Sequence, residues 1–196
     1  MISTDNGGDR RVRKTKKALR NGLAELMVTK DLRNITVREL TEKVDIHRAT
    51  FYSHYNDIYD LYEQMEDAIV IELNDIIMQN YSQPPNYFYK ILFEYLISNK
   101  QLCYMLFGKN RESSFMTRLN ILFEERCIET WCKNWKYTEI SEDLRYKVRY
   151  HVQGCLGIIS RWVESNFTKS MDELIKIISD IDRNMESYVM KKLKKA

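Results

Sequence analysis

Residues 36–55 read TVRELTEKVDIHRATFYSHY, and this stretch determines the fold that we expect. Its first four residues have the form of a helix capping box. In such a box the Thr36 hydroxyl accepts a hydrogen bond from the backbone N–H of Glu39, and the Glu39 side chain reaches back to the start of the helix. A short helix should therefore begin at Thr36 and end near Val44.

A tight turn should follow this helix. Asp45 stands where a sharply turning chain needs a left-handed backbone, which glycine adopts most easily and Asp tolerates. The apolar Ile46 should fill the turn, and a second short helix should open at His47. Two short helices around an apolar turn form a helix-turn-helix, whose second helix fits the major groove of DNA while the first braces it across the backbone.

The charge of the chain is concentrated at its front. Residues 1–55 carry 12 Lys/Arg and 7 Asp/Glu, whereas residues 56–196 carry 19 and 21. The basic residues are densest between Arg10 and Arg20, and they include Lys14 and Lys17. Such a cluster is typical of proteins that bind polyanions, although a solubilising basic arm would look the same.

The composition favours an all-α fold. Only 6 Gly and 2 Pro occur in 196 residues, fewer turn formers than a strand-built fold needs. Apolar residues recur at helical spacing in every long segment. We expect a tail at residues 1–9 that is disordered, and helices near residues 10–29, 57–82, 87–98, 101–107, 114–135, from Ser141 and from Ser170.

Several classes of protein are disfavoured by what the sequence lacks. It has no apolar signal segment and no long apolar run, so we expect a cytoplasmic protein. It has no Glu-x-x-His pair, no phosphate-binding glycine loop and no G-x-S-x-G elbow, so we expect no enzyme, no cofactor and no metal. The four cysteines form no CxxC pair, and we expect buried thiols.

The segment ITVRELTEKVDIHRATFYSHYNDIYDLYEQM (residues 35–65) resembles the DNA-binding domain of the tetracycline-repressor (TetR) family. With the basic helix in front of it, the resemblance covers about residues 10–65. More loosely, residues 154–162 and the capped final helix are similar to regulators related to dihydroxyacetone-kinase operon activators. The resemblance implies a helix-turn-helix domain over residues 10–56 and a helical regulatory and dimerisation domain over residues 57–196.

The resemblance also implies roles for individual residues. The second helix of the motif, which opens at His47, is the reading helix. Its first turn faces base edges, and Arg48 is placed for a bidentate contact to guanine. Tyr52 and His54 match positions that contact phosphates, while Phe51 and Tyr55 pack inward. The full set of residues expected to contact DNA is Lys14, Lys17, Thr36, Arg38, His47, Arg48, Ala49, Thr50, Tyr52 and His54.

Three positions depart from the family pattern. Thr41 stands where a small residue is usual, and Asp45 where Gly is usual. Ile58 stands where a Lys that contacts a phosphate is usual, so one backbone contact should be missing and DNA binding should be less sensitive to salt.

In the resembled family, the C-terminal part dimerises through its last two helices and binds a small effector. Gly154 and Gly157 would let another helix approach closely, either a partner's or one of the same chain. The residues that we selected as candidates for an effector pocket are Phe88, Tyr104, Phe107, Trp131, His151 and Cys155. An aromatic stripe of this kind also fits an ordinary core.

The sequence therefore predicts a homodimeric transcription regulator that binds a palindromic operator, with DNA affinity controlled by an effector, and family habit favours a repressor. Two alternatives remain open at this point. One is a helical adaptor that binds proteins only, and the other is an activator that depends on a protein co-regulator without a small ligand.

Overall fold

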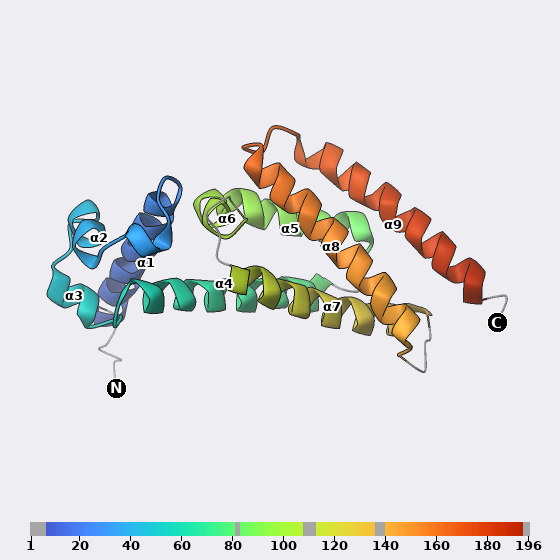
Figure 1. The fold of residues 1–196 in the computed structure, drawn as a ribbon, viewed down its shortest axis with the longest axis horizontal. Helices are drawn as coiled ribbons and strands as arrows, with labels where there is room; N and C mark the ends of the chain where they lie inside the picture. Colours follow the sequence, from blue (N-terminus) through green and yellow to red (C-terminus); the bar gives the residue numbers. More distant parts are fainter. Residues whose placement is uncertain (1–6, 81–82, 108–112, 136–139, 194–196) are drawn as a thin grey trace. The chain divides into compact units, whose positions relative to one another are not determined.

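The computed structural model describes residues 7–80, 83–107, 113–135 and 140–193, and Figure 1 shows their arrangement. Every regular element in these ranges is helical, which confirms the all-α prediction. The elements are α1 (Gly7–Met27), a 3-10 turn η1 (Leu32–Asn34), α2 (Val37–Lys43), α3 (Arg48–Tyr52), α4 (Ile58–Asn80), α5 (Pro85–Ser98), α6 (Lys100–Phe107), α7 (Ser113–Trp135), α8 (Glu142–Glu164) and α9 (Met171–Leu193).

The helices form two compact units. The first comprises Met1–Ile71 with Lys100–Met116, and the second comprises Glu72–Asn99 with Thr117–Ala196. The chain therefore passes between the two units at three places, because α6 packs against α1 of the first unit. The functional division that we expect between residues 56 and 57 stays a prediction.

The observed helix boundaries differ slightly from those expected. α1 begins at Gly7, so residues 7–9 belong to the first helix, while residues 1–6 lie outside the described residues. α5 begins at Pro85 rather than near Tyr87. The reason is that proline is favoured in the first turn of a helix, where its missing N–H costs nothing. The loop expected at residues 108–113 lies almost wholly outside the described residues.

The core of the first unit is built on α1. Leu19, Leu23 and Met27 are almost wholly buried, as the helical spacing predicts. Leu40 of α2 and Phe51 of α3 are both fully buried. α2 packs against α1, and α3 in turn packs against α2.

The last two long helices of the second unit are both capped at their N-termini, and α9 packs against α5. Ser141 caps α8 by accepting from the N–H of Leu144, and a complete capping box starts α9. There the N–H of Ser170 donates to the Glu173 carboxylate (2.9 Å) and the N–H of Glu173 donates to the Ser170 hydroxyl (3.3 Å). No helix within the described ranges is both long enough and apolar enough to cross a membrane.

Candidate DNA-binding surface and interior cavity

The helix-turn-helix has the predicted geometry at its cap and turn. Thr36 Oγ1 accepts from the N–H of Glu39 at 3.1 Å. Only this half of the expected capping box forms, since the Glu39 carboxylate bonds the ammonium group of Lys30 instead. Asp45 has φ 53°, the left-handed conformation expected of the turn, and the N–H of Ile46 closes the turn on the carbonyl of Thr41 at 3.0 Å.

The inner side of α3 is aromatic. Phe51 and Tyr55 are buried, with ring centroids 5.6 Å apart. Lys16 of α1 lies over the Tyr55 ring, with its Nζ atom 5.9 Å from the centroid, within the range of a cation–π contact. The predicted inward packing of both rings is confirmed, and it fixes the rotation of α3 about its own axis.

The outer side of α3 carries the residues expected to face DNA. His47 is the N-cap and, with Arg48 and Ala49, is exposed, while Thr50 is half-buried. The Tyr52 ring is 51% exposed although its edge packs on Phe51. The short helix thus presents its first turn outward.

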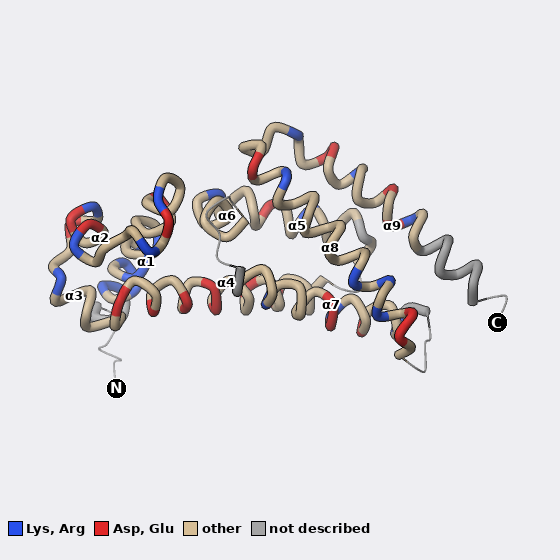
Figure 2. The backbone as a smooth tube through the Cα atoms, viewed as in Figure 1, with Lys and Arg blue, Asp and Glu red and all other residues tan. Residues whose placement is uncertain are grey.

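The first unit carries many basic residues: Figure 2 shows Lys and Arg positions along α1 and on α2 and α3, with Asp and Glu positions among those of α2. Lys14 and Lys17 are exposed, and within the described residues neither forms an ion pair with an acid. Arg38 of α2 is exposed too, but its Nε atom bonds Glu42 at 2.7 Å. The charge available to a polyanion therefore comes mainly from α1.

The departures from the family pattern have structural explanations. Thr41 is buried, and its hydroxyl bonds the carbonyls of Val37 (2.8 Å) and Arg38 (3.0 Å) of its own helix, so it needs no outside partner. Ile58 is buried at the start of α4. That position therefore contributes to the core, and the expectation of a missing phosphate contact there stays a prediction.

The second unit contains a partly open cavity of about 240 Å³. Its walls come from the end of α4 and from α5, α7, α8 and α9. Most of the lining is apolar or aromatic, and the polar groups come from several elements. Three of the lining residues, Tyr89, His151 and Asp182, meet at its polar side. Four of the six expected ligand residues line it, namely Phe88, Trp131, His151 and Cys155.

The polar side of the cavity is a hydrogen-bonded group. The Tyr89 hydroxyl donates to Asp182 Oδ2 at 2.5 Å, and Asp182 Oδ1 lies 3.4 Å from Nδ1 of His151. Cys155 Sγ is 3.9 Å from Nε2 of His151. Burial lowers the pKa of His151, although the Asp182 carboxylate opposes this shift. Burial raises the pKa of Asp182, and His151 and Tyr89 oppose it.

The other two expected ligand residues do not line this cavity. Tyr104 and Phe107 lie on α6 in the first unit, where Phe107 packs against Phe115 with ring centroids 6.0 Å apart. Helical spacing could not separate them from the cavity residues, because both sets lie on buried faces. Asp182 was missed, although its position four residues after the buried Ile178 was a usable signal: it is an acid on the inner face of an apolar helix.

Comparison with known proteins shows to which family the chain belongs. A TetR-type family model described as transcriptional regulator C-terminal region matches residues 82–184, more than half of the chain. The chain belongs to the TetR family of transcriptional regulators. Membership of this family agrees with the expectation that the chain is a regulator and not an enzyme.

A curated regulator and several solved structures are similar to this chain. The uncharacterized HTH-type regulator YxbF of Bacillus subtilis (strain 168) is 37% identical over 68 residues, which are 34% of this chain and 18% of that relative. A TetR regulator from Streptococcus agalactiae 2603V has a similar fold, with TM-score 0.63, 19% identity, and coverage of 89% of this chain and 96% of that one. The dihydroxyacetone kinase operon activator DhaS gives TM-score 0.62 at 18% identity, covering 90% and 96%.

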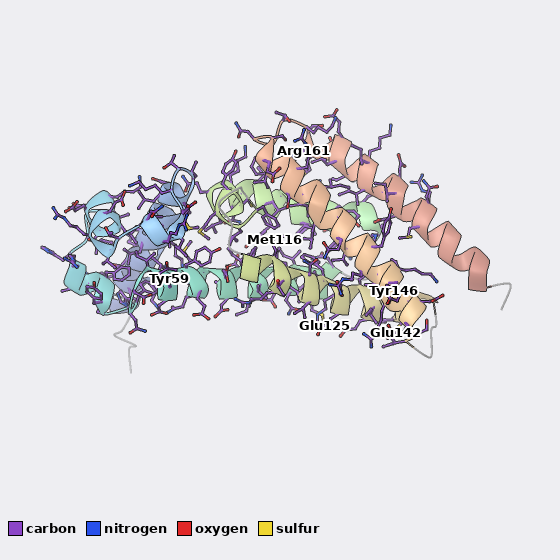
Figure 3. The ribbon with its side chains drawn as sticks, viewed as in Figure 1. Tyr59, Met116, Glu125, Glu142, Tyr146 and Arg161 are labelled. Atoms are coloured by element: carbon purple, nitrogen blue, oxygen red, sulfur yellow. The ribbon has the colours of Figure 1, made fainter. Side chains whose placement is uncertain are left out.

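The outer face of α8 in this TetR protein is open around two glycines. Gly154 and Gly157 are exposed, and a Cβ atom at either would meet nothing within 4 Å. They therefore do not serve close packing within the described chain, which was one of the two possibilities. Tyr146 and Arg161 lie near opposite ends of the same helix (Figure 3), and Tyr146 is 72% exposed.

Proposed function

We propose that this TetR-family chain is a DNA-binding transcription regulator that binds a palindromic operator as a homodimer. The observation that carries the proposal is the exposed first turn of α3, where His47 and Arg48 face outward. The same unit carries Lys14 and Lys17 of α1, which are exposed and pair with no acid within the part of the chain that the structure describes. The exposed turn supplies hydrogen-bonding groups for base edges, and the lysines supply attraction to phosphates. An adaptor that binds only proteins would need neither.

The homodimer is proposed to form through α8 and α9. Tyr146 and Tyr150 are 72% and 73% exposed on α8, and Ile177 and Ile181 are 39% and 47% exposed on α9. Large apolar groups gathered on one exposed surface commonly mark a protein interface. Two-fold symmetry would place two reading helices to match the two halves of a palindromic operator.

The cavity of the second unit is proposed to hold a small effector that controls DNA affinity. Its volume of about 240 Å³ and its largely apolar walls suit a small ligand held by a few polar groups. An effector that binds the DNA-free state of the chain more tightly than the DNA-bound state would lower the operator affinity. The decrease would be set by the ratio of the two effector affinities. We propose repression as the mode of action, so that such an effector raises transcription of the target.

Selection from random duplexes followed by salt-titrated anisotropy tests DNA binding. We expect an inverted repeat, and an affinity that falls steeply as salt rises, with a logarithmic slope of about −0.9 for each neutralised phosphate. Enrichment of no inverted repeat, with no duplex bound at low salt, would favour the adaptor. If His47→Ala and Arg48→Ala fold normally but no longer bind the selected duplex, the first turn of α3 is the DNA-binding surface.

The effector proposal needs a separate test. Compounds that raise the melting temperature of the protein would be compared with a variant, Thr130→Phe, whose new ring fills the cavity that Thr130 lines. We expect an effector to stabilise only the unaltered chain and to release it from the operator. A ligand that binds the cavity without changing operator affinity would contradict the proposal.

A further inference from the structure

Three different metal-binding side chains meet at the polar side of the cavity. His151 and Cys155 are four residues apart on α8, so they share one face of that helix. Asp182 approaches them from α9. One donor atom from each residue can be chosen so that all three lie within 4.8 Å of one another.

We propose that His151, Cys155 and Asp182 form a binding site for a divalent transition metal, with Zn²⁺ as the best fit. Imidazole nitrogen, thiolate sulfur and carboxylate oxygen are the three ligand types that proteins offer to zinc. Bonds of about 2.0 to 2.3 Å in a tetrahedron separate donor atoms by about 3.3 to 3.8 Å. The 3.4 Å between Asp182 Oδ1 and His151 Nδ1 falls in this range. Cys155 Sγ lies 3.9 Å from the other ring nitrogen, Nε2, so a side chain of the cluster would have to turn for one metal ion to bind all three residues.

The Asp182 carboxylate is oriented by a neighbouring hydroxyl group and has one oxygen available for a metal ion. Its Oδ2 atom accepts the Tyr89 hydroxyl, which fixes the orientation of the group. Its Oδ1 atom is buried and forms no hydrogen bond within the described residues. A buried carboxylate oxygen without a donor is costly, and a cation would remove that cost. Tyr89 would act as an outer-shell residue that orients the ligand.

The other two donors would bind the metal as a neutral imidazole and a thiolate. Metal binding would release the thiol proton of Cys155 to solvent, as zinc does when it deprotonates a coordinating thiol.

The open side of the site faces the cavity. Three protein ligands leave a fourth tetrahedral position for water or another small molecule, the arrangement of zinc sites that stay accessible. Cys127 also lines the cavity but lies outside the three-donor cluster. The inference goes beyond the proposed DNA binding, and metal binding can be measured whether or not the chain binds an operator.

The test uses the full-length chain, stripped of metal by a chelator and titrated with Zn²⁺ and with Co²⁺. We expect one metal per chain and, with Co²⁺, the near-ultraviolet charge-transfer band of a thiolate–cobalt bond. Cys155→Ser should abolish that band, and Asp182→Asn should weaken binding of both metals. Cys132→Ser is the matched control, since Cys132 is a half-buried thiol of α7 that does not line the cavity.

Two further measurements distinguish the loss of a metal ligand from damage to the fold. Tyr89→Phe should keep the cobalt band but weaken the affinity by about 10- to 100-fold, as loss of an outer-shell partner does. Trp131 lies near His151, with ring centroids 5.4 Å apart and the rings tilted at 43°. Bound Co²⁺ should therefore quench its fluorescence, and Trp131→Phe should remove that quenching. No binding at micromolar metal, or a band that survives Cys155→Ser, would overturn the proposal.

Discussion

Gly22 of α1 lies directly against Val44 at the end of α2. A Cβ atom placed on Gly22 would overlap Cγ1 of Val44 and would come within 3.0 Å of Cδ1 of Leu40. The crossing of these two helices therefore requires glycine at position 22. Because α2 braces the reading helix α3, this contact sets where the proposed DNA-binding residues stand.

Gly22→Ala should lower the free energy of unfolding by about 1 to 3 kcal/mol, the usual cost of overpacking a tight contact. Val44 is β-branched and cannot rotate aside cheaply. Urea unfolding at fixed protein concentration would measure the loss. Asn21→Ala, at the exposed neighbouring position, is the control and should change little. The double variant Gly22→Ala/Val44→Ala removes the overlapping methyl group. If it were no more stable than Gly22→Ala, the overlap with Val44 would not be the cause of the lost stability.

Asp45 offers a second test of the same motif. Its φ of 53° suits glycine best and suits β-branched residues least. Asp45→Val should destabilise the chain by about 1 to 2 kcal/mol, while Asp45→Gly should leave stability unchanged or raise it by less than about 1 kcal/mol. Thermal melting of the two variants would show the order. Equal melting temperatures would mean that the turn does not hold this backbone conformation in solution.

The helix-turn-helix could be predicted closely because its signals are local. The cap at Thr36, the left-handed turn at Asp45 and the inward rings of Phe51 and Tyr55 each depend on residues within a few positions along the chain. Gly22 could not be found in this way. Its requirement arises from Val44, which is distant in sequence, and a glycine within a helix carries no local sign of such contact.

The charge at the start of α9 makes stability depend on pH in a predictable direction. Hydrogen bonds from the Ser170 N–H and hydroxyl hold the pKa of Glu173 below its ordinary value. The folded chain therefore binds this proton at a lower pH than the unfolded chain does. The contribution of Glu173 is present above its unfolded pKa and is lost as the pH falls through the lowered one.

NMR titration of the Glu173 carboxyl group should give a pKa below 4.5, the ordinary value. Ser170→Ala removes one of the two donor groups and should raise that pKa. Glu173→Gln should make the decline of the melting temperature between about pH 6 and pH 3 shallower than in the unaltered chain. A Glu173 pKa that Ser170→Ala leaves unchanged would show that the capping box does not set it.

The cavity was only partly predictable. His151 and Cys155 lie one helical turn apart, so the sequence indicated that they share a face. Asp182 and Tyr89 join them only through the packing of α5 and α9 against α8, and no local pattern specifies that packing. Tyr104 and Phe107 were grouped with the cavity residues for the same reason, because a buried aromatic residue does not indicate which core it enters.

Single substitutions should divide the proposed DNA-binding surface into two kinds of contact. Arg48→Ala should relax base preference at one operator position, with a loss of about 1 to 3 kcal/mol for the selected site. Lys17→Ala should weaken all duplexes alike and reduce the salt slope by about 1. Anisotropy titrations with selected and scrambled duplexes would separate them. If Arg48→Ala lowered the affinity for the selected and the scrambled duplex equally, Arg48 would not read a base.

Gly157 provides the sharpest test of the proposed dimer, because α8 has free space around it within the chain. A Cβ atom at Gly157 would touch nothing within 4 Å. Gly157→Leu should therefore leave the fold of the single chain intact, while its side chain would block a partner helix from approaching closely. Light scattering at micromolar concentration should show a dimer for the unaltered chain and a monomer for Gly157→Leu. Gln153→Leu, another exposed residue of α8, controls for added apolar surface. A Gly157→Leu chain that remained dimeric and bound the operator normally would place the interface elsewhere on the protein.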